Sequence, residues 1–128
     1  MEDRYLFKAK RLDTHDWILG FLSMHKTGKY FIRPIGGSAS SSEEVEKNTI
    51  CQCTGLKDKN GKLIWENDII KTRVGIAKVI WNKSEWRIEW LKNDLWRKDL
   101  YYWAVEDIQR TVVIGNIFDN KELLESEG

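Results

Sequence analysis

The chain of 128 residues is long enough for one ordinary domain, or for one domain with a small appendage, around a single hydrophobic core. A net charge of +1 and an aromatic content of 12% exclude an intrinsically disordered chain, which would be strongly charged and poor in aromatic residues. The apolar runs are too short to cross a membrane, and two cysteines are too few for the disulfide framework of a small secreted domain. The acidic start does not resemble a signal peptide. We therefore expect a cytoplasmic protein.

The charge is unevenly distributed along the chain. Residues 1–56 carry eight Lys/Arg and seven Asp/Glu, residues 57–100 carry eleven and seven, and residues 101–128 carry two and six. The basic middle and the acidic tail could pair within one molecule or between neighbours, and the basic stretch could also meet a polyanion. Solvated surface charge is the simpler alternative.

The first 35 residues predict an N-terminal β segment of three short strands separated by polar turns. The expected strands cover residues 4–12, 17–22 and 30–32. Within the second strand, Gly20 indicates a bulge or a close approach of two backbones. Pro34 is expected to end the third strand, because proline lacks the N–H donor of a ladder.

Residues 36–48 predict a flexible loop rich in Gly, Ser and Glu. The Gly-Gly-Ser run in it is not followed by the Lys-Ser/Thr pair of a phosphate-binding loop, so we expect no phosphate there. The acidic residues that follow Ser42 could begin a short helix, although the run lacks an apolar stripe.

Residues 49–128 predict the main β core of the protein. Expected strands cover residues 49–54, 63–65, 68–73, 74–81, 86–90 and 112–118. Asn60-Gly61 indicates a hairpin with a type I′ turn. The pattern of residues 95–103 does not distinguish a strand from a loop. Asp119 and Glu122 resemble a capping box that opens a short helix over residues 120–125. Many short strands with closely spaced turns indicate a small barrel or roll.

The second half of the chain carries three motifs in a fixed order. Gln-Cys-Thr-Gly-Leu-Lys-Asp-Lys-Asn-Gly ends at Gly61, Ile-Trp-Glu-Asn-Asp-Ile-Ile follows, and Val-Ile-Gly-Asn-Ile-Phe-Asp-Asn precedes Glu-Leu-Leu near the end. In order and spacing, these segments resemble the YopX family of phage and prophage proteins. Cys53, Asn67 and Lys121 stand where that family usually has Tyr, Gly and Pro. Asn67 is the mildest departure, because Asn tolerates the left-handed conformation of a glycine.

The resemblance covers residues 50–125 strongly and the N-terminal strands loosely. It implies a mainly β fold (β-rich α+β), with an SH3-like small barrel or roll, additional N-terminal strands and a short C-terminal helix. It also implies a phage or prophage origin and a bacterial host cell. It implies no activity and assigns no functional residue, because the biochemical role of the family is not established.

The sequence offers only weak candidates for a metal or catalytic site. Cys51 and Cys53 share a strand face and could join His15 and His25 at zinc, but the spacing does not match that of structural zinc sites, so we expect buried cysteines and no metal or cofactor. Alternatively, Glu66 and Asp68 form a paired-carboxylate candidate, yet acids at a strand entry more often accept backbone N–H bonds. A site centred on a histidine is conceivable but unsupported. With no known catalytic motif present, we expect a protein that is not an enzyme.

Tryptophan is the most unusual feature, because five of the seven lie between residues 81 and 103 among basic residues. Trp86, Ile88 and Trp90 alternate and predict a buried strand face. Trp96, flanked by Arg97 and Lys98 in an irregular region, is the better candidate for exposure. The candidate binding surface therefore comprises Lys83, Arg87, Lys92, Trp96, Arg97 and Lys98.

Two kinds of partner fit this surface. Trp and Arg concentrate at protein interfaces, which favours protein–protein contacts, including self-association into a homo-oligomer. Basic groups and exposed aromatic rings also bind single-stranded nucleic acid, which makes residues 81–103 an alternative nucleic-acid surface. We expect a phage-derived, non-enzymatic binding or accessory module that acts through protein contacts. Neither a membrane nor a small-molecule substrate is indicated.

Overall fold

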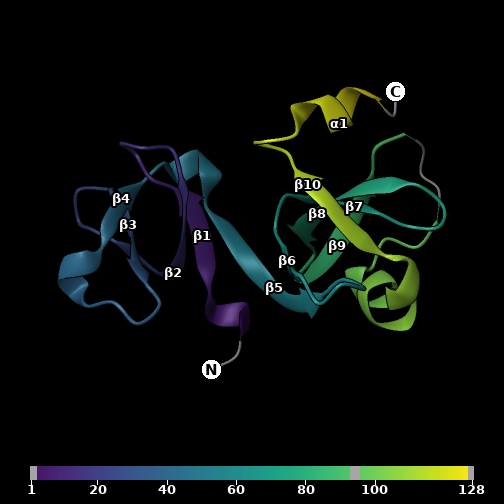
Figure 1. The fold of residues 1–128 in the computed structure, drawn as a ribbon, viewed down its shortest axis with the longest axis horizontal. Helices are drawn as coiled ribbons and strands as arrows, with labels where there is room; N and C mark the ends of the chain where they lie inside the picture. Colours follow the sequence, from purple (N-terminus) through teal and green to yellow (C-terminus); the bar gives the residue numbers. More distant parts are fainter. Residues whose placement is uncertain (1–2, 93–95, 127–128) are drawn as a thin grey trace. The chain divides into compact units, whose positions relative to one another are not determined.

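The computed structural model describes residues 3–92 and 96–126, and strands dominate these ranges (Figure 1). The strands are β1 (Phe7–Lys10), β2 (Trp17–Met24), β3 (Tyr30–Pro34), β4 (Glu43–Val45), β5 (Cys51–Lys57), β6 (Leu63–Trp65), β7 (Asp68–Lys71), β8 (Ile76–Asn82), β9 (Glu85–Trp90) and β10 (Val112–Asn116). The helical elements are η1 (Asp3–Tyr5), η2 (Ala39–Ser41), η3 (Lys47–Thr49), η4 (Tyr102–Glu106), η5 (Ile108–Arg110) and α1 (Lys121–Ser126). The predicted mainly β fold is confirmed. The chain divides into two compact units, Met1–Cys53 and Thr54–Gly128.

The first unit is an antiparallel sheet in the order β4-β3-β2-β1-β5. Glu46 N donates to Lys10 O at 2.8 Å and Leu12 N donates to Glu44 O at 2.9 Å, so β4 also meets the end of β1. This contact closes β1 to β4 around a small core and covers the free edge of β4. The core side chains are Ala9, Ile18, Ile32 and Val45.

Gly20 lies where two strands approach closely. It pairs with Pro34 across β2 and β3, and a Cβ at this position would overlap the carbonyl oxygen of Arg33. The predicted close approach of backbones at Gly20 is confirmed.

The segment 36–48 contains more regular structure than its composition suggests. Glu43–Val45 forms β4 and not the start of a helix, so the prediction of a helix after Ser42 is wrong. The strand forms because it pairs with Tyr30–Ile32 of β3, and this pairing also places Val45 in the core. Such long-range pairing leaves no periodic signal within an acidic run of three residues.

The second unit is built on a sheet in the order β10-β7-β8-β9. Beyond β9, Asp99 forms a bridge with Arg87 and Ile88 N donates to Lys98 O at 2.7 Å, so residues 98–99 continue the sheet. The 3-10 turn η5 then leads into β10, which returns to pair with β7. This meander with a returning last strand has the connectivity of an SH3-like barrel.

The core of the second unit gathers buried side chains from β6 to β10 and from the helical turn before β10, and Leu56 of β5 packs against them. Its buried members are Ile64, Ile70, Ala77, Val79, Ile88, Trp90, Leu100, Trp103, Ala104 and Val113. Trp86 is partly buried against them, so the predicted inward face of β9 is confirmed. Cys51 and Cys53 are buried free thiols in the first unit, as expected for small core residues.

Residues 100–103 are helical and not a strand or an irregular loop. Leu100 begins a helical turn that continues into η4, a π-helix. Leu100 and Trp103 are fully buried from this turn, and their packing in the core overrides the weak local pattern. Residue 95, the first of this ambiguous stretch, lies outside the described residues. The C-terminal helix α1 agrees with its predicted position to within one residue.

The hairpin turns differ in type from the prediction. At Asn60-Gly61 only Gly61 has a positive φ, and Gly61 N donates to Asp58 O at 3.0 Å. This is the geometry of a longer loop with one left-handed glycine, and the predicted type I′ turn is wrong here. The turn with two left-handed residues instead joins β8 to β9, at Lys83 and Ser84, with φ of 53° and 63°. Asn67 has a φ of 70°, as expected of a residue that replaces glycine.

Asp58 ties the turn after β5 to the last strand. Its carboxylate is 1% exposed, and it accepts backbone N–H bonds from Asn60, Lys62 and Val113, all at 2.9 Å. One buried acid therefore satisfies donors that are far apart in the sequence. None of the helices in the described residues is long and apolar enough to cross a membrane.

Candidate functional site

Four of the six predicted surface residues line one open depression of about 320 Å³ in the second unit. We call it the basic depression. Its lining residues are Ile80, Asn82, Lys83, Arg87, Ile88, Glu89, Trp90, Lys92 and Lys98.

The four cations reach the basic depression from different elements. Lys83 stands in the tight turn between β8 and β9, and Arg87 lies on β9 opposite Ile80. Lys92 follows β9, and Lys98 is brought alongside by its backbone bond to Ile88. Residues spread over sixteen positions of the chain therefore converge because the hairpin and the following segment form one sheet.

The basic depression keeps an excess of positive charge. Arg87 Nη1 lies 2.7 Å from a carboxylate oxygen of Glu85, and Lys78 Nζ lies 3.5 Å from one of Glu89. Lys83 and Lys92, by contrast, have no carboxylate within ion-pair distance in the part of the chain that the structure describes. Exposed ion pairs are worth little, so even the paired groups remain available to an anion.

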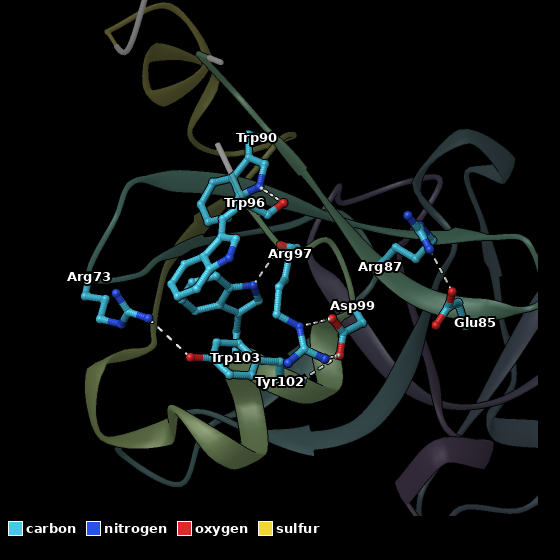
Figure 2. A network of polar contacts seen from close by, with 9 residues as sticks. All are labelled: Arg73, Glu85, Arg87, Trp90, Trp96, Arg97, Asp99, Tyr102 and Trp103. Carbon is cyan, nitrogen blue, oxygen red and sulfur yellow. Dashed lines mark hydrogen bonds and ion pairs between the residues drawn. The ribbon is translucent and has the colours of Figure 1, made fainter. Parts of the chain in front are cut away.

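Trp96 lies outside the depression, in a cluster of aromatic rings and arginines (Figure 2). Its side chain is 49% exposed, and the guanidinium carbon of Arg73 lies 4.5 Å from the ring centroid. The rings of Trp103 and Tyr102 lie 5.7 and 5.9 Å away. A half-exposed indole is therefore held from several sides. We call Arg73, Trp96, Tyr102 and Trp103 the aromatic cluster.

Arg73 is fixed by two further contacts. Its Nε donates to Asp107 Oδ2 at 3.1 Å, and its Nη2 donates to the Tyr102 hydroxyl at 3.2 Å. The hydrogen bond to Tyr102 raises the pKa of Arg73, and partial desolvation opposes this effect. The guanidinium therefore stays charged at every physiological pH, which a cation–π contact requires.

Two indole N–H groups hold the backbone that carries Trp96 and Arg97. Trp90 Nε1 donates to Trp96 O at 3.2 Å, and Trp103 Nε1 donates to Arg97 O at 3.0 Å. The rings of Trp90 and Trp103 meet edge to face at 5.4 Å. The buried tryptophans thus serve as core residues and also position the exposed one.

Arg97 is less available to a partner than the sequence suggested. Its guanidinium donates two hydrogen bonds to Asp99, at 3.0 and 3.1 Å, and lies 4.4 Å from the Tyr102 ring centroid. The bidentate pair neutralises its charge in a fixed orientation. Arg97 therefore belongs with the aromatic cluster, and it does not line the basic depression.

Sequence reasoning missed Arg73 altogether. Nothing near Arg73 distinguishes it from other surface arginines, because its partners lie 23 to 34 positions later in the chain. Trp81 was not singled out either, although it is 54% exposed beside Trp86 at the end of the β8–β9 hairpin.

The other chemical candidates form no assembled site. Asp68 is buried and accepts a hydrogen bond from Trp65 N at 2.8 Å, and His15 Nδ1 lies 3.0 Å from a Glu46 oxygen. His25 stacks against Phe31, with the ring centroids 4.2 Å apart. No group of three or more metal-ligating side chains comes together in residues 3–92 and 96–126.

The match to a known family extends well beyond the three motifs at residues 52–70 and 113–124. The sequence profile described as YopX protein matches residues 23–125. The chain belongs to the YopX family. The YopX match begins at Ser23, near the end of β2, so it includes β3, β4 and the barrel but not β1. No curated protein matches the chain significantly.

A solved structure agrees with this fold. The crystal structure of protein EF1440 from Enterococcus faecalis is similar with a TM-score of 0.56 and 25% sequence identity. The similarity covers 92% of this chain and 96% of that one, so the two proteins share both units.

The YopX motifs themselves are structural. Asp58 joins a turn to β10, and Asn67 occupies a left-handed position. At Gly115 a Cβ would overlap Asn120, whose Oδ1 accepts the N–H of Asn116 at 3.0 Å. None of these residues lines the basic depression, although the YopX match spans the lining residues of the depression as well.

Proposed function

We propose that this YopX protein is a phage-derived, non-enzymatic binding module that acts through protein–protein contacts in the bacterial cytoplasm. The basic depression and the neighbouring Trp96 form its binding surface. The observation that carries the proposal is the fixed, half-exposed Trp96 beside a concave surface lined by four cations. Anchored Trp and Arg side chains next to a pocket are the usual source of binding energy in protein interfaces.

A protein partner fits Trp96 better than a nucleic acid does. Arg73 lies 4.5 Å from the centroid of the ring and occupies one of its faces. A nucleic acid base would need to stack on a free face, whereas a protein side chain can also pack against the ring edge. The depression also has a half-buried apolar member, Ile80, which suits a side chain better than a phosphate.

The test compares two exposed tryptophans. Tagged wild-type protein, Trp96→Ala and Trp81→Ala would be expressed in the bacterial host and cross-linked, and the cross-linked residues would be mapped by mass spectrometry. We expect partner cross-links near Lys92 and Lys98 in the wild type and in Trp81→Ala, and their loss in Trp96→Ala. Equal cross-linking in all three proteins would contradict the proposed surface, because Trp81 and Trp96 are similarly exposed but only Trp96 belongs to that surface.

Single-stranded nucleic acid is the second candidate, favoured by the uncompensated charge of Lys83 and Lys92. It predicts binding of a fluorescent single-stranded oligonucleotide with a strong salt dependence. Four phosphate contacts would give a slope of about −3 for the logarithm of affinity against that of salt concentration, and each lysine removed would reduce its magnitude by about 0.7. An anisotropy titration at low salt that shows no binding would remove this candidate.

A further inference from the structure

A second depression, of opposite charge, lies in the first unit. It has a volume of about 400 Å³ and is lined by Leu12, Asp13, Glu43 and Glu44. We call it the acidic depression. Closure of the first unit creates it, because Leu12 N donates to Glu44 O at 2.9 Å and thereby brings the turn after β1 against β4. Leu12 is 49% exposed there, an aliphatic side chain among three carboxylates.

The carboxylates of the acidic depression are uncompensated. In the described residues, none of Asp13, Glu43 and Glu44 has a basic group within ion-pair distance, and Arg11 next to them in the chain forms no such pair either. Three negative charges on one concave surface repel each other, and a bound cationic surface would relieve this repulsion.

The two depressions complement each other in charge and composition. The acidic depression presents three carboxylates around an exposed leucine, and the basic depression presents four cations around the half-buried Ile80. Because each copy of the chain carries one depression of each kind, two copies can join through unlike surfaces, which is a head-to-tail contact.

We propose that the acidic depression of one copy binds the basic depression of a second copy. The carboxylates of Glu43 and Glu44 meet the cations, and Leu12 packs beside Ile80. This names the partner of the binding surface described above and therefore rests on the proposed function. Repeated head-to-tail contacts close into a ring where the geometry allows it and otherwise extend into a chain.

Sedimentation velocity tests the contact with two charge-reversed variants. The acid variant carries Glu43→Lys and Glu44→Lys, and the base variant carries Lys83→Glu and Lys92→Glu, which sit in no ion pair of the described residues. Glu122→Lys with Glu125→Lys on α1 makes the same charge change as the acid variant at residues that line neither depression. Circular dichroism establishes that each variant is folded.

We expect the sedimentation coefficient of the wild type to rise with concentration at low salt, and each single variant to stay monomeric. An equimolar mixture of the acid and base variants should form a heterodimer, because one depression of each remains native. High salt should dissociate the assemblies, since it shortens the screening length from about 10 Å at 0.1 M to about 3 Å at 1 M. The α1 control should behave as the wild type.

A wild type that stays monomeric at all concentrations would overturn the proposal, as would a mixture that forms no heterodimer. An oligomer that survives in the acid variant would also overturn it, since the contact would then lie elsewhere. These results leave the proposed function separately testable. If the protein is monomeric but its cross-links to another protein still depend on Trp96, only the identification of the partner as a second copy fails.

Discussion

Arg73 and Trp96 meet in a cation–π contact of 4.5 Å, although 22 residues lie between them in the chain. The same arginine is bonded to Tyr102, as Figure 2 shows, and also to Asp107. One side chain that follows β7 therefore orders the segment that carries the exposed indole. Trp96 is therefore presented in one orientation, which lowers the entropic cost of binding through it.

Replacing Arg73 by Gln should lower the stability of the protein, because it removes the cation–π contact and leaves the partly buried Asp107 without its partner. It should also free the ring of Trp96. Urea denaturation measures the first effect. The ¹⁹F resonance of 5-fluorotryptophan at position 96, assigned with Trp96→Phe, measures the second and should narrow and move toward the free-indole value.

Arg73→Lys is the matched control for this substitution. It keeps the charge but loses the planar fork that serves Asp107 and Tyr102 together, so it should retain only part of the stability. A Gln variant with an unchanged Trp96 resonance would show that the buried tryptophans alone hold the ring.

Asp58→Ala should destabilise the protein by about 3 kcal/mol or more, since three backbone N–H groups lose a charged, buried acceptor. Asp58→Asn keeps one acceptor oxygen but brings a donor amide against N–H groups, so it should recover only part of the loss. Thermal and urea unfolding measure both variants. A loss below about 0.5 kcal/mol in Asp58→Ala, the level of a neutral surface change, would contradict the structural role assigned to this YopX motif residue.

Strands with a clear apolar pattern were predictable from the sequence, and contacts distant in sequence were not. The alternation of Trp86, Ile88 and Trp90 and the backbone constraint at Gly20 are local signals, and both predictions are confirmed. β4 was missed because Glu43–Val45 becomes a strand only by pairing with β3.

The residues of the candidate surface also divide into those predictable from local sequence and those that depend on distant contacts. The sequence identified Lys83, Arg87, Lys92 and Lys98, which a continuous hairpin and its extension bring together. It did not identify Arg73, nor did it separate Arg97 from the depression, because the contacts to Asp99 and to the aromatic rings depend on the helical turn at residues 100–106. The acidic depression was missed as well, since it depends on closure of the first unit around β4.

Gly20→Ala should destabilise the first unit strongly, because the added methyl group would overlap Arg33 O and a backbone oxygen cannot move aside without breaking the pairing of β2 and β3. We expect a loss of about 2 kcal/mol or more, in the range of other overpacked sites. Gly28→Ala provides a contrast, since a Cβ there meets nothing within 4 Å and the cost comes only from its φ of 87°. Hydrogen exchange should show the loss of stability in β2 and β3. An equal loss in Gly20→Ala and Gly28→Ala would mean that the backbone conformation of glycine, and not the overlap with Arg33 O, accounts for the effect.

Ser84→Gly should stabilise the protein. Lys83 and Ser84 both occupy the left-handed region, which costs an L-residue about 1–2 kcal/mol and costs glycine almost nothing. The type I′ turn between β8 and β9 therefore carries strain that Gly at its second position relieves, as in the Asn-Gly turns of designed hairpins. The greater flexibility of glycine in the unfolded chain offsets part of the gain, so we expect a stabilisation of about 0.5–1 kcal/mol in urea denaturation.

Ser41→Gly, in the 3-10 turn η2, should give no such gain. A loss of stability in Ser84→Gly would mean that the Ser84 side chain contributes more than its backbone strain costs. Since Lys83 stays in place, the same variant should leave binding at the basic depression unchanged, which separates the stability of the hairpin from the function of its lysine.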